Sequence, residues 1–404
     1  MILECDQRNI EIDHNRITTI SADAVNFGGC IPKKLSSIIC SEFNYLELKL
    51  LLDRAHNLPV TDPRRLSLLN CYNDQLANTI FTALPTEKVI FNSIEFKESA
   101  CSHLGLPSPT LAPLKGQPIA SHYYTFVDEF GYNVKTVTGV AGGHRTIFHN
   151  EIHSVVADSA YRAGIPLKGK PPETCSNLFN DCINIPDSNL EMDRITQGII
   201  PDILIKANGG SDGMEAPPTM FDDMDTLLDV KTLGPGLAYN KGTHITDRPV
   251  ELRQDEVNKQ YHAKALSIDF KFNNTPRGEK GRVSHRLDSF GQDGKVAGLV
   301  FGAFGEGSSH VYQLAAYISK RTALNEAQYT LDTVLDRKHL RAKAMKNLIN
   351  TWGLTVHRGW ARLLVDRAAL LIRRQHVEED VPFDASGQEE HPYAEEVLYQ
   401  DQGD

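Results

Sequence analysis

The sequence predicts an α/β protein in which a central mixed sheet, flanked by helices, spans roughly residues 120 to 320. Two short apolar runs of strand type, residues 200–205 and 227–233, lie close together in the chain, and each contains an acid. Apolar residues at helical spacing precede these runs and follow them. The predicted order is helix, three strands, helix, strand, with helical extensions before and after this core.

The first predicted helix precedes the acidic strands. Its apolar and small residues recur at helical spacing on one face: Ile152, Val155, Val156, Ser159, Ala160 and Ala163. Asn150 or Thr146 can cap its beginning, and Gly164 followed by Pro166 is expected to end it. Glu151 then lies near the N-terminal end of this helix, at the margin of the apolar face.

The two strand-like runs carry the residues of most chemical interest. Asp202 lies in the first run, and Asp229 lies in the second, where Lys231 follows two residues later. Because side chains alternate along a strand, Asp229 and Lys231 project from one face, roughly 6.5 Å apart. The apolar flanks favour central strands, and buried charges need a partner or a metal. The structural alternative is a strand-entry turn at Asp202 and a solvated strand edge at Asp229 and Lys231.

An acid on one strand, with an acid and a lysine on its neighbour, suits metal-assisted hydrolysis of a phosphodiester. Asp202 and Asp229 are the expected ligands of Mg²⁺ or Mn²⁺, since carboxylate oxygens bind such hard cations. The cation polarises the phosphate and lowers the pKa of a bound water. Lys231 would position that water or offset charge that develops on the phosphate.

A helix is predicted after the second acidic strand, because Val257, Tyr261 and Ala265 fall at helical spacing. Gln260 and Tyr261 of this helix are expected to support the site. The following residues, 268–270, are typical of a strand.

Residues 296–301 predict the last strand of the core. A glycine-rich turn leads from it into a helix around residues 311–318, with Ser308 or Ser309 as the cap. Residues 325–375 then predict two helices that are broken near Trp352 and Gly353.

Charge is distributed unevenly along the chain. The net charge is −10, but residues 377–404 contain ten acids and no lysine or arginine, so residues 1–376 are neutral. Residues 320–374 hold twelve lysines and arginines against four acids. Such a segment can follow a phosphate backbone, or it can form a solvated helix face. The expected nucleic-acid contacts are Arg337, Lys338, Arg341, Lys343 and Lys346.

These patterns divide the chain into four parts. Residues 1–115 form a largely helical region whose role the sequence does not assign, and residues 116–324 form the α/β domain. Residues 325–376 form the basic helical segment, and residues 377–404 have the composition of a disordered acidic tail. No apolar run is long enough to span a membrane, and no secretory signal is evident. An intracellular protein, nuclear or cytoplasmic, without a membrane partner is therefore expected.

The order Glu151, Pro201-Asp202, Asp229-Val230-Lys231 resembles the motif of the PD-(D/E)xK restriction-endonuclease-like nucleases. Further short motifs make the chain similar to the nuclease-like segment after the polymerase in reverse-transcriptase-bearing mobile elements, notably non-LTR retrotransposons. These motifs are residues 127–131, Gly142-Gly143, His149-Asn150, Ala163-Gly164 and residues 302–306. The resemblance covers roughly residues 120 to 320.

The resemblance implies a restriction-endonuclease-like core and a Mg²⁺-dependent DNA endonuclease. It assigns the catalytic roles to Glu151, Asp202, Asp229 and Lys231, while His149, Asn150 or Glu173 remain alternatives to Glu151 at the first position. The chain departs from the mobile-element pattern in two ways. No cysteine that could belong to a zinc knuckle lies between Cys101 and Cys175, and no Tyr-x-Asp-Asp polymerase signature occurs.

Two other functions remain open at this point. A nuclease fold that has lost its activity can persist as a nucleic-acid-binding module. A histidine-based metallohydrolase is the second alternative, because His149 and His153 are four residues apart on one predicted helix and can reach the same metal ion. His144 would be its third ligand.

Overall fold

The structure is a computed structural model. It describes residues 48–59, 62–84, 89–119, 125–137, 143–184, 195–196, 198–207, 220–222, 224–235, 248–291, 294–327 and 334–379. The predicted acidic tail beyond residue 379 and the first 47 residues lie outside this part of the chain.

A small four-stranded mixed sheet forms the centre of the protein. Its strands are β1 (Leu167–Lys168), β2 (Ile203–Ile205), β3 (Thr226–Thr232) and β4 (Ala297–Phe301), in the spatial order β1-β2-β3-β4. β2 pairs antiparallel with both β1 and β3, whereas β3 and β4 are parallel. The predicted mixed sheet flanked by helices is confirmed, since a helix precedes β1–β3 and further helices separate β3 from β4. β2 and β3 are interior strands, as their apolar flanks predicted.

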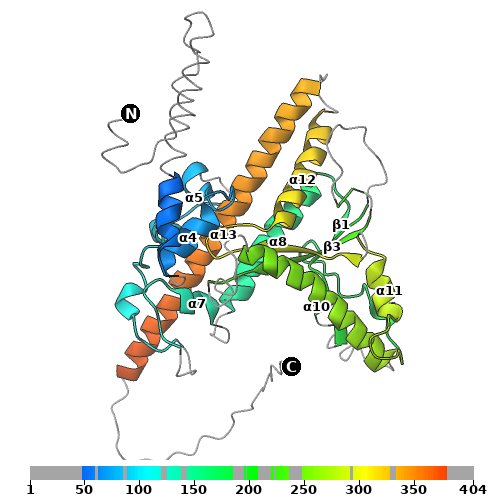
Figure 1. Ribbon diagram of the computed structural model, residues 1–404, viewed down its shortest axis with the longest axis horizontal. Coiled ribbons are helices and arrows are strands. Elements are labelled where there is room, and N and C mark those ends of the chain that lie inside the picture. Colours follow the sequence, from blue (N-terminus) through cyan, green and yellow to red (C-terminus); the bar gives the residue numbers. More distant parts are fainter. Residues whose placement is uncertain are drawn as a thin grey trace, which may run out of the picture.

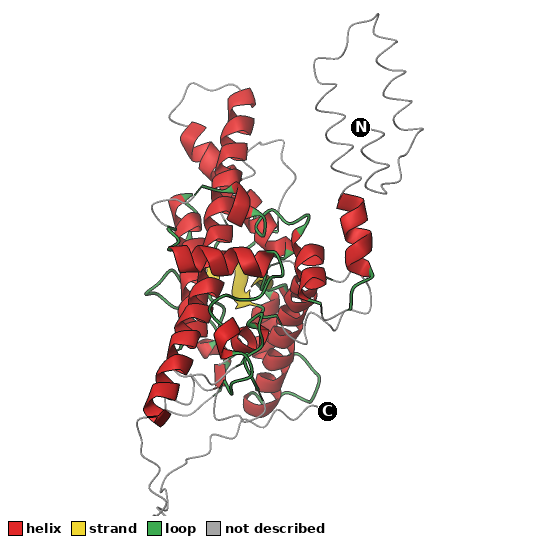
Figure 2. Cartoon of the chain, turned by 90° about the vertical axis from the view of Figure 1, so that its left-hand side faces the viewer, coloured by secondary structure: helices red, strands yellow, loops and turns green. Residues whose placement is uncertain are grey.

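Helices cover both faces of this sheet, and Figure 2 shows the strands enclosed by them. α8 (His144–Arg162), α12 (Ser309–Ala327) and α13 (Val334–Glu379) pack on one face, where β3 contributes Leu228 and Val230. α10 (Pro249–Phe272) and α11 (Arg282–Asp288) pack on the other, where β3 contributes Leu227. Side-chain alternation therefore directs Asp229 and Lys231 to the face covered by α10.

α13 is one continuous helix of 46 residues, so the predicted break near Trp352 and Gly353 is wrong. In Figure 1 it runs unbroken from beside α12 to beyond α7. The glycine at position 353 serves close packing: a Cβ there would lie 2.3 Å from Thr79 Oγ1 and 2.6 Å from the Leu76 carbonyl oxygen. Contact between neighbouring segments, and not a helix end, explains why glycine occupies this position.

α10 continues through residues 268–270, so the strand predicted there is wrong. Ile268 extends the buried row of Tyr261 and Ala265 along the same helix face. Asp269 is also buried, and its carboxylate accepts hydrogen bonds from the backbone N–H groups of Gly281, Val283 and Ser284 at 2.9–3.0 Å. Asp269 thus satisfies free N–H groups at the beginning of α11, a tertiary role that the apolar pattern could not show.

Two helix beginnings differ from the prediction. α8 begins at His144, and Gly143 before it has φ +60° and provides no side-chain cap. α12 begins at Ser309, where Glu251 and Gln254 of α10 accept the N–H groups of Ser309 and His310 at 2.9 Å.

Other helix ends follow the sequence signals. Gly164, at φ +70°, follows the last turn of α8, and Ile165 N–H donates back to the Ala160 carbonyl, which is the glycine-based ending that the sequence predicted. Ser308 is one of the two predicted caps of α12. Its side chain contacts β4, where it donates to Gly298 O and accepts from Val300 N–H.

Short helices precede residue 137. They are α4 (Pro63–Cys71), α5 (Thr79–Thr82), α6 (Ser93–His103), the 3₁₀ turn η1 (Ala112–Leu114) and α7 (Tyr132–Thr136), while residues 48–56 are also helical. Of these helices, α5, α6 and α7 pack against α13, and α4 packs against α6. A second 3₁₀ turn, η2 (Asn180–Cys182), lies near α11. Leu111 and Leu114, at and beside η1, form a buried cluster with Leu364 of α13. Buried Asp74 joins this region to the core through hydrogen bonds from Tyr312 and Arg248, each 2.6 Å long.

We predict that Gly353→Ala lowers the free energy of unfolding by about 1–3 kcal/mol, because the added methyl group overlaps α5. On an exposed helix the same change would be stabilising by about 1 kcal/mol. Urea unfolding of the variant beside Lys346→Ala, an exposed position on α13, measures the effect. Equal or higher stability of Gly353→Ala would contradict the packing argument.

Candidate active site

Three elements bring Asp202, Asp229, Lys231 and Tyr261 together. Lys231 Nζ donates to Asp229 Oδ1 at 2.9 Å and lies 2.8 Å from Oδ2. From α10, the Tyr261 hydroxyl lies 3.3 Å from Asp229 Oδ1 and 3.0 Å from the Ile200 carbonyl oxygen. Asp229 is therefore held between the lysine of its own strand and a tyrosine of the covering helix.

Asp202 lies immediately before β2 and contacts β3 on both sides of Asp229. Its backbone N–H donates to Leu228 O at 3.0 Å, and its Oδ2 accepts the N–H of Val230 at 2.6 Å. The side chain thus continues the hydrogen bonding of the sheet where β2 begins. This arrangement fixes the Asp202 carboxylate beside the strand that carries Asp229 and Lys231.

His149 of α8 completes the cluster. Its Nε2 lies 3.0 Å from Val230 O and 3.4 Å from Asp202 Oδ2, and its Nδ1 lies 3.2 Å from Asn150 Oδ1. An Nε2–H tautomer would donate toward both Val230 O and Asp202. The sequence contains one signal for this placement. His149 lies at helical spacing before Ile152 and Val156, so it is a polar residue on an otherwise apolar helix face.

The members of the cluster differ in how far they are exposed to solvent. The Asp229 side chain is 5% exposed, whereas that of Lys231 is 35% exposed. Asp202 and His149 are intermediate, at 21% and 26%. A substrate approaching from solvent would therefore meet Lys231, Asp202 and His149 before Asp229.

The surroundings shift the pKa values of the two acids in opposite directions. Burial alone would raise the pKa of Asp202, but the hydrogen bond and charge of His149 and the Val230 N–H hold it below the usual value. Burial raises the pKa of Asp229, and the negative charge of Asp202 adds to this effect while Lys231 opposes it. The hydrogen bond to Asp202 raises the pKa of His149 despite its burial.

The residues present can hold a small divalent cation. Asp229 Oδ2 is buried and lies beside Lys231 Nζ but receives no hydrogen bond of suitable angle, so an oxygen with free lone pairs remains inside the site. Mg²⁺ is commonly bound by one or two carboxylates, with waters and phosphate oxygens completing its octahedron. The part of the chain that the structure describes contains no group of three or more histidine, cysteine, aspartate or glutamate side chains able to hold a metal. Within the cluster, Asp202 and Asp229 are the two carboxylates that could hold such a cation.

Several predicted residues do not join this cluster. Glu151 contacts Arg362 of α13 at 3.1 Å, in a neighbourhood shared with Glu95. This separation follows from helix geometry, because Glu151 is two residues from His149 and projects from a different side of α8. Gln260 and Glu173 are exposed.

The three histidines of the alternative metal site are not brought together. His144 lies 3.6 Å from Asp366 of α13, whereas His149 lies beside Asp202. The rings of His149 and His153 are 6.2 Å apart between centroids. The structure therefore favours a carboxylate-centred site over one built on His144, His149 and His153.

The predicted nucleic-acid contacts lie on the N-terminal half of α13. Arg337, Lys338, Lys343 and Lys346 are exposed, and Arg341 is half-buried. Other basic residues of the segment have structural roles, which reduces the charge available to a ligand. Lys320 pairs with Asp222, Arg362 pairs with Glu95 and Glu151, and Arg367 is buried.

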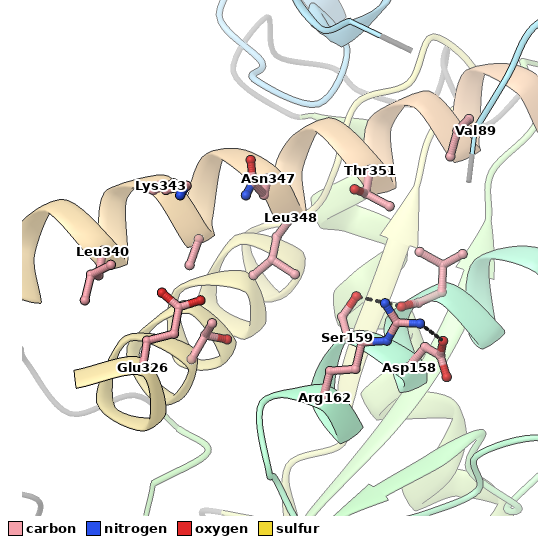
Figure 3. Close-up of a pocket in the computed structure, with 13 residues that line it drawn as sticks. Val89, Asp158, Ser159, Arg162, Glu326, Leu340, Lys343, Asn347, Leu348 and Thr351 are labelled. Carbon is pink, nitrogen blue, oxygen red and sulfur yellow. Dashed lines mark hydrogen bonds and ion pairs between the residues drawn. The ribbon is translucent and has the colours of Figure 1, made fainter. Parts of the chain in front are cut away.

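A separate pocket of about 260 Å³ lies between α8, α12 and α13. Figure 3 shows Glu326, Lys343 and Asn347 around it, with Arg162 directed toward Asp158 at a distance of 3.3 Å. None of the acids of the Asp202–Asp229 cluster lines this pocket. It is therefore distinct from the candidate active site.

Comparisons with known proteins gave no match to a family model, a curated protein or a solved structure. Among the described residues, no helix combines the length and apolar character needed to cross a membrane.

We predict that His149→Gln removes a pH-dependent part of the stability. A raised histidine pKa stabilises the fold below the unfolded value near 6.5, and this contribution is lost as pH rises through the folded pKa. The lowered pKa of Asp202 stabilises the fold above 3.8, and that part is lost as pH falls. The His149–Asp202 pair therefore contributes most to stability between pH 3.8 and pH 6.5. Because the pair is partly exposed, this contribution is at most about 1 kcal/mol.

Urea unfolding between about pH 5 and 8 measures this contribution. The wild type should lose stability relative to His149→Gln as pH rises, while His144→Gln, which removes the more exposed pair with Asp366, follows the wild type more closely. Parallel pH profiles for the wild type and His149→Gln would show that the pair does not form.

Proposed function

We propose that this protein hydrolyses phosphodiester bonds of DNA with Mg²⁺ or Mn²⁺. The observation that carries the proposal is the contact of Lys231 with Asp229 on an interior strand, with Asp202 hydrogen-bonded to the same strand. Such a reaction requires two carboxylates, a lysine and access from solvent. The mixed sheet flanked by helices supports the proposed restriction-endonuclease-like core, whereas the proposed retroelement origin rests on the sequence motifs alone.

Each residue of the cluster has a distinct role in this proposal. Asp202 and Asp229 would bind the cation, which supplies Lewis acidity and a more acidic bound water. Lys231, held against Asp229, orients the attacking water or offsets charge that forms on the phosphate. Tyr261 donates to Asp229 and restrains its carboxylate, and its raised pKa keeps the hydroxyl protonated for that bond.

His149 replaces Glu151 as the fourth member of the site in this proposal. It contacts Asp202 and Val230 O, whereas Glu151 is held by Arg362. A histidine at hydrogen-bond distance from a ligand carboxylate orients that carboxylate. The pairing also keeps Asp202 ionised, as metal binding requires.

We further propose that DNA contacts the basic N-terminal half of α13. Lys343 and Lys346 are exposed there, and Arg337 lies further along the same helix. Lysine and arginine side chains contribute sequence-independent affinity by displacing counterions from phosphates. We therefore assign these residues to the DNA backbone and none of them to base recognition.

We predict that purified protein nicks supercoiled plasmid with Mg²⁺ or Mn²⁺ but not with EDTA. Asp229→Asn and Lys231→Met should each abolish detectable nicking, because they remove a ligand and the charge beside the phosphate. Glu151→Gln is the matched control and should retain nicking, since Glu151 contacts Arg362. Gel electrophoresis of the plasmid forms gives the rates.

Nicking that survives Asp229→Asn and Lys231→Met would refute the assigned site. DNA binding without nicking under any metal would instead identify an inactive nucleic-acid-binding module. Tightly held zinc in the purified protein would favour histidine ligands over the two carboxylates.

We further predict that the double substitution Lys343→Gln and Lys346→Gln weakens DNA binding on every sequence. The slope of log affinity against log salt concentration should fall by about two, one for each lost phosphate contact. Arg373→Gln, on the exposed far end of α13, is the control and should leave the slope unchanged. Fluorescence anisotropy with a labelled duplex measures both quantities. An unchanged slope in the double variant would exclude this part of α13 from the DNA interface.

A further inference from the structure

Two arginines lie near each other at the beginning of α8, and neither pairs with an acid in the described part of the chain. Arg145, in the first turn of α8, donates through Nη1 to Thr136 O at 3.2 Å. Arg367 of α13 is 3% exposed and donates through Nη1 to Val134 O and Val137 O. Both guanidinium groups therefore converge on the C-terminal end of α7.

The carbonyls of α7 do not neutralise this pair. Within the described residues no carboxylate pairs with either arginine, and the neighbouring Asp366 lies beside His144. Residues 138–142, Thr-Gly-Val-Ala-Gly, contain no acid. Burial and the charge of Arg145 lower the pKa of Arg367 to about 10, which is the effect of an uncompensated positive charge. Its Nε is buried and has no hydrogen-bond acceptor among the described residues.

The beginning of α8 adds further donors. α8 has 19 residues, and its N-cap, Gly143, is exposed and supplies no side-chain acceptor to the first N–H groups. The N-terminal end of such a helix carries partial positive charge and favours anions. Gly143 is exposed, and a Cβ at this position would meet no atom of the described residues within 4 Å.

We propose that Arg145 and the first N–H groups of α8 bind a tetrahedral oxyanion, with the buried positive charge of Arg367 behind them, and that in function this anion is a backbone phosphate of the reacting DNA strand. The second part rests on the proposed nuclease function. Arg145 and His149 are four residues apart and lie on the same face of α8, about 6 Å apart along its axis. A phosphate at Arg145 would therefore lie next to the phosphate that reacts beside His149 and Asp202.

Arg145 acts as a positioning residue in this arrangement. It would hold one phosphate and so fix the neighbouring scissile phosphate over Asp202 and Asp229. Arg367 is buried behind Arg145. It adds positive charge to the site without contacting the phosphate. The contact is with the backbone, so it positions the strand and carries no sequence preference.

The experiment compares full-length wild type, Arg145→Gln and Arg162→Gln. Arg162 is the matched control, because it is an exposed arginine at the opposite end of α8. The first measurement is the thermal unfolding midpoint with inorganic phosphate or with chloride at equal ionic strength. Phosphate should raise the midpoint of the wild type and of Arg162→Gln more than that of Arg145→Gln. Equal responses of all three proteins would overturn the anion site, whether or not the protein cleaves DNA.

The second measurement is DNA binding in metal-free buffer across a salt series. Arg145→Gln should bind severalfold more weakly, with a slope lower by about one, while Arg162→Gln matches the wild type. If the phosphate response depends on Arg145 but the DNA slope does not, the site takes free phosphate and the strand assignment is wrong. Loss of nicking in all proteins, with both Arg145 effects present, would refute hydrolysis and leave the phosphate contact standing.

Discussion

The structure depends on the compensation of one buried negative charge. Asp229 is on an interior strand whose neighbouring residues, Leu228 and Val230, pack into the main core. An isolated carboxylate there would be too costly to keep ionised. Lys231 and Tyr261 contact it directly, and α10 must cover this face for Tyr261 to reach it. The position of β3 between two helical layers therefore sets the position and the chemistry of the cluster together.

Much of the core was predictable because it rests on local periodicity. The alternation of Leu227, Leu228 and Val230 fixes which face Asp229 takes, and the spacing of Val257 and Tyr261 fixes the covering helix. These patterns depend only on neighbours along the chain. The two acids and the lysine were brought together for the same reason.

The predictions that differ from the structure concern residues whose conformation depends on contacts with distant parts of the chain. Gly353 is in the middle of α13 because α5 approaches it, and Asp269 belongs to a helix because it caps α11. The motif order points to Glu151, whereas the helical spacing places His149 on the buried face of α8 with Ile152 and Val156. The Glu151 carboxylate is held by Arg362, 211 positions later in the chain, a partner that no local pattern identifies.

The continuity of α13 has a consequence for how the protein can present charge. A helix of 46 residues is about 70 Å long, and its side chains rotate by a fixed angle of about 100° per residue. The packing of Trp352 and Trp360 in the core fixes how α13 is rotated about its own axis. The direction in which Lys343 and Lys346 face is thereby determined by the core. A single inserted residue between the two regions would turn the basic side chains away by about a quarter turn, with composition and net charge almost unaltered.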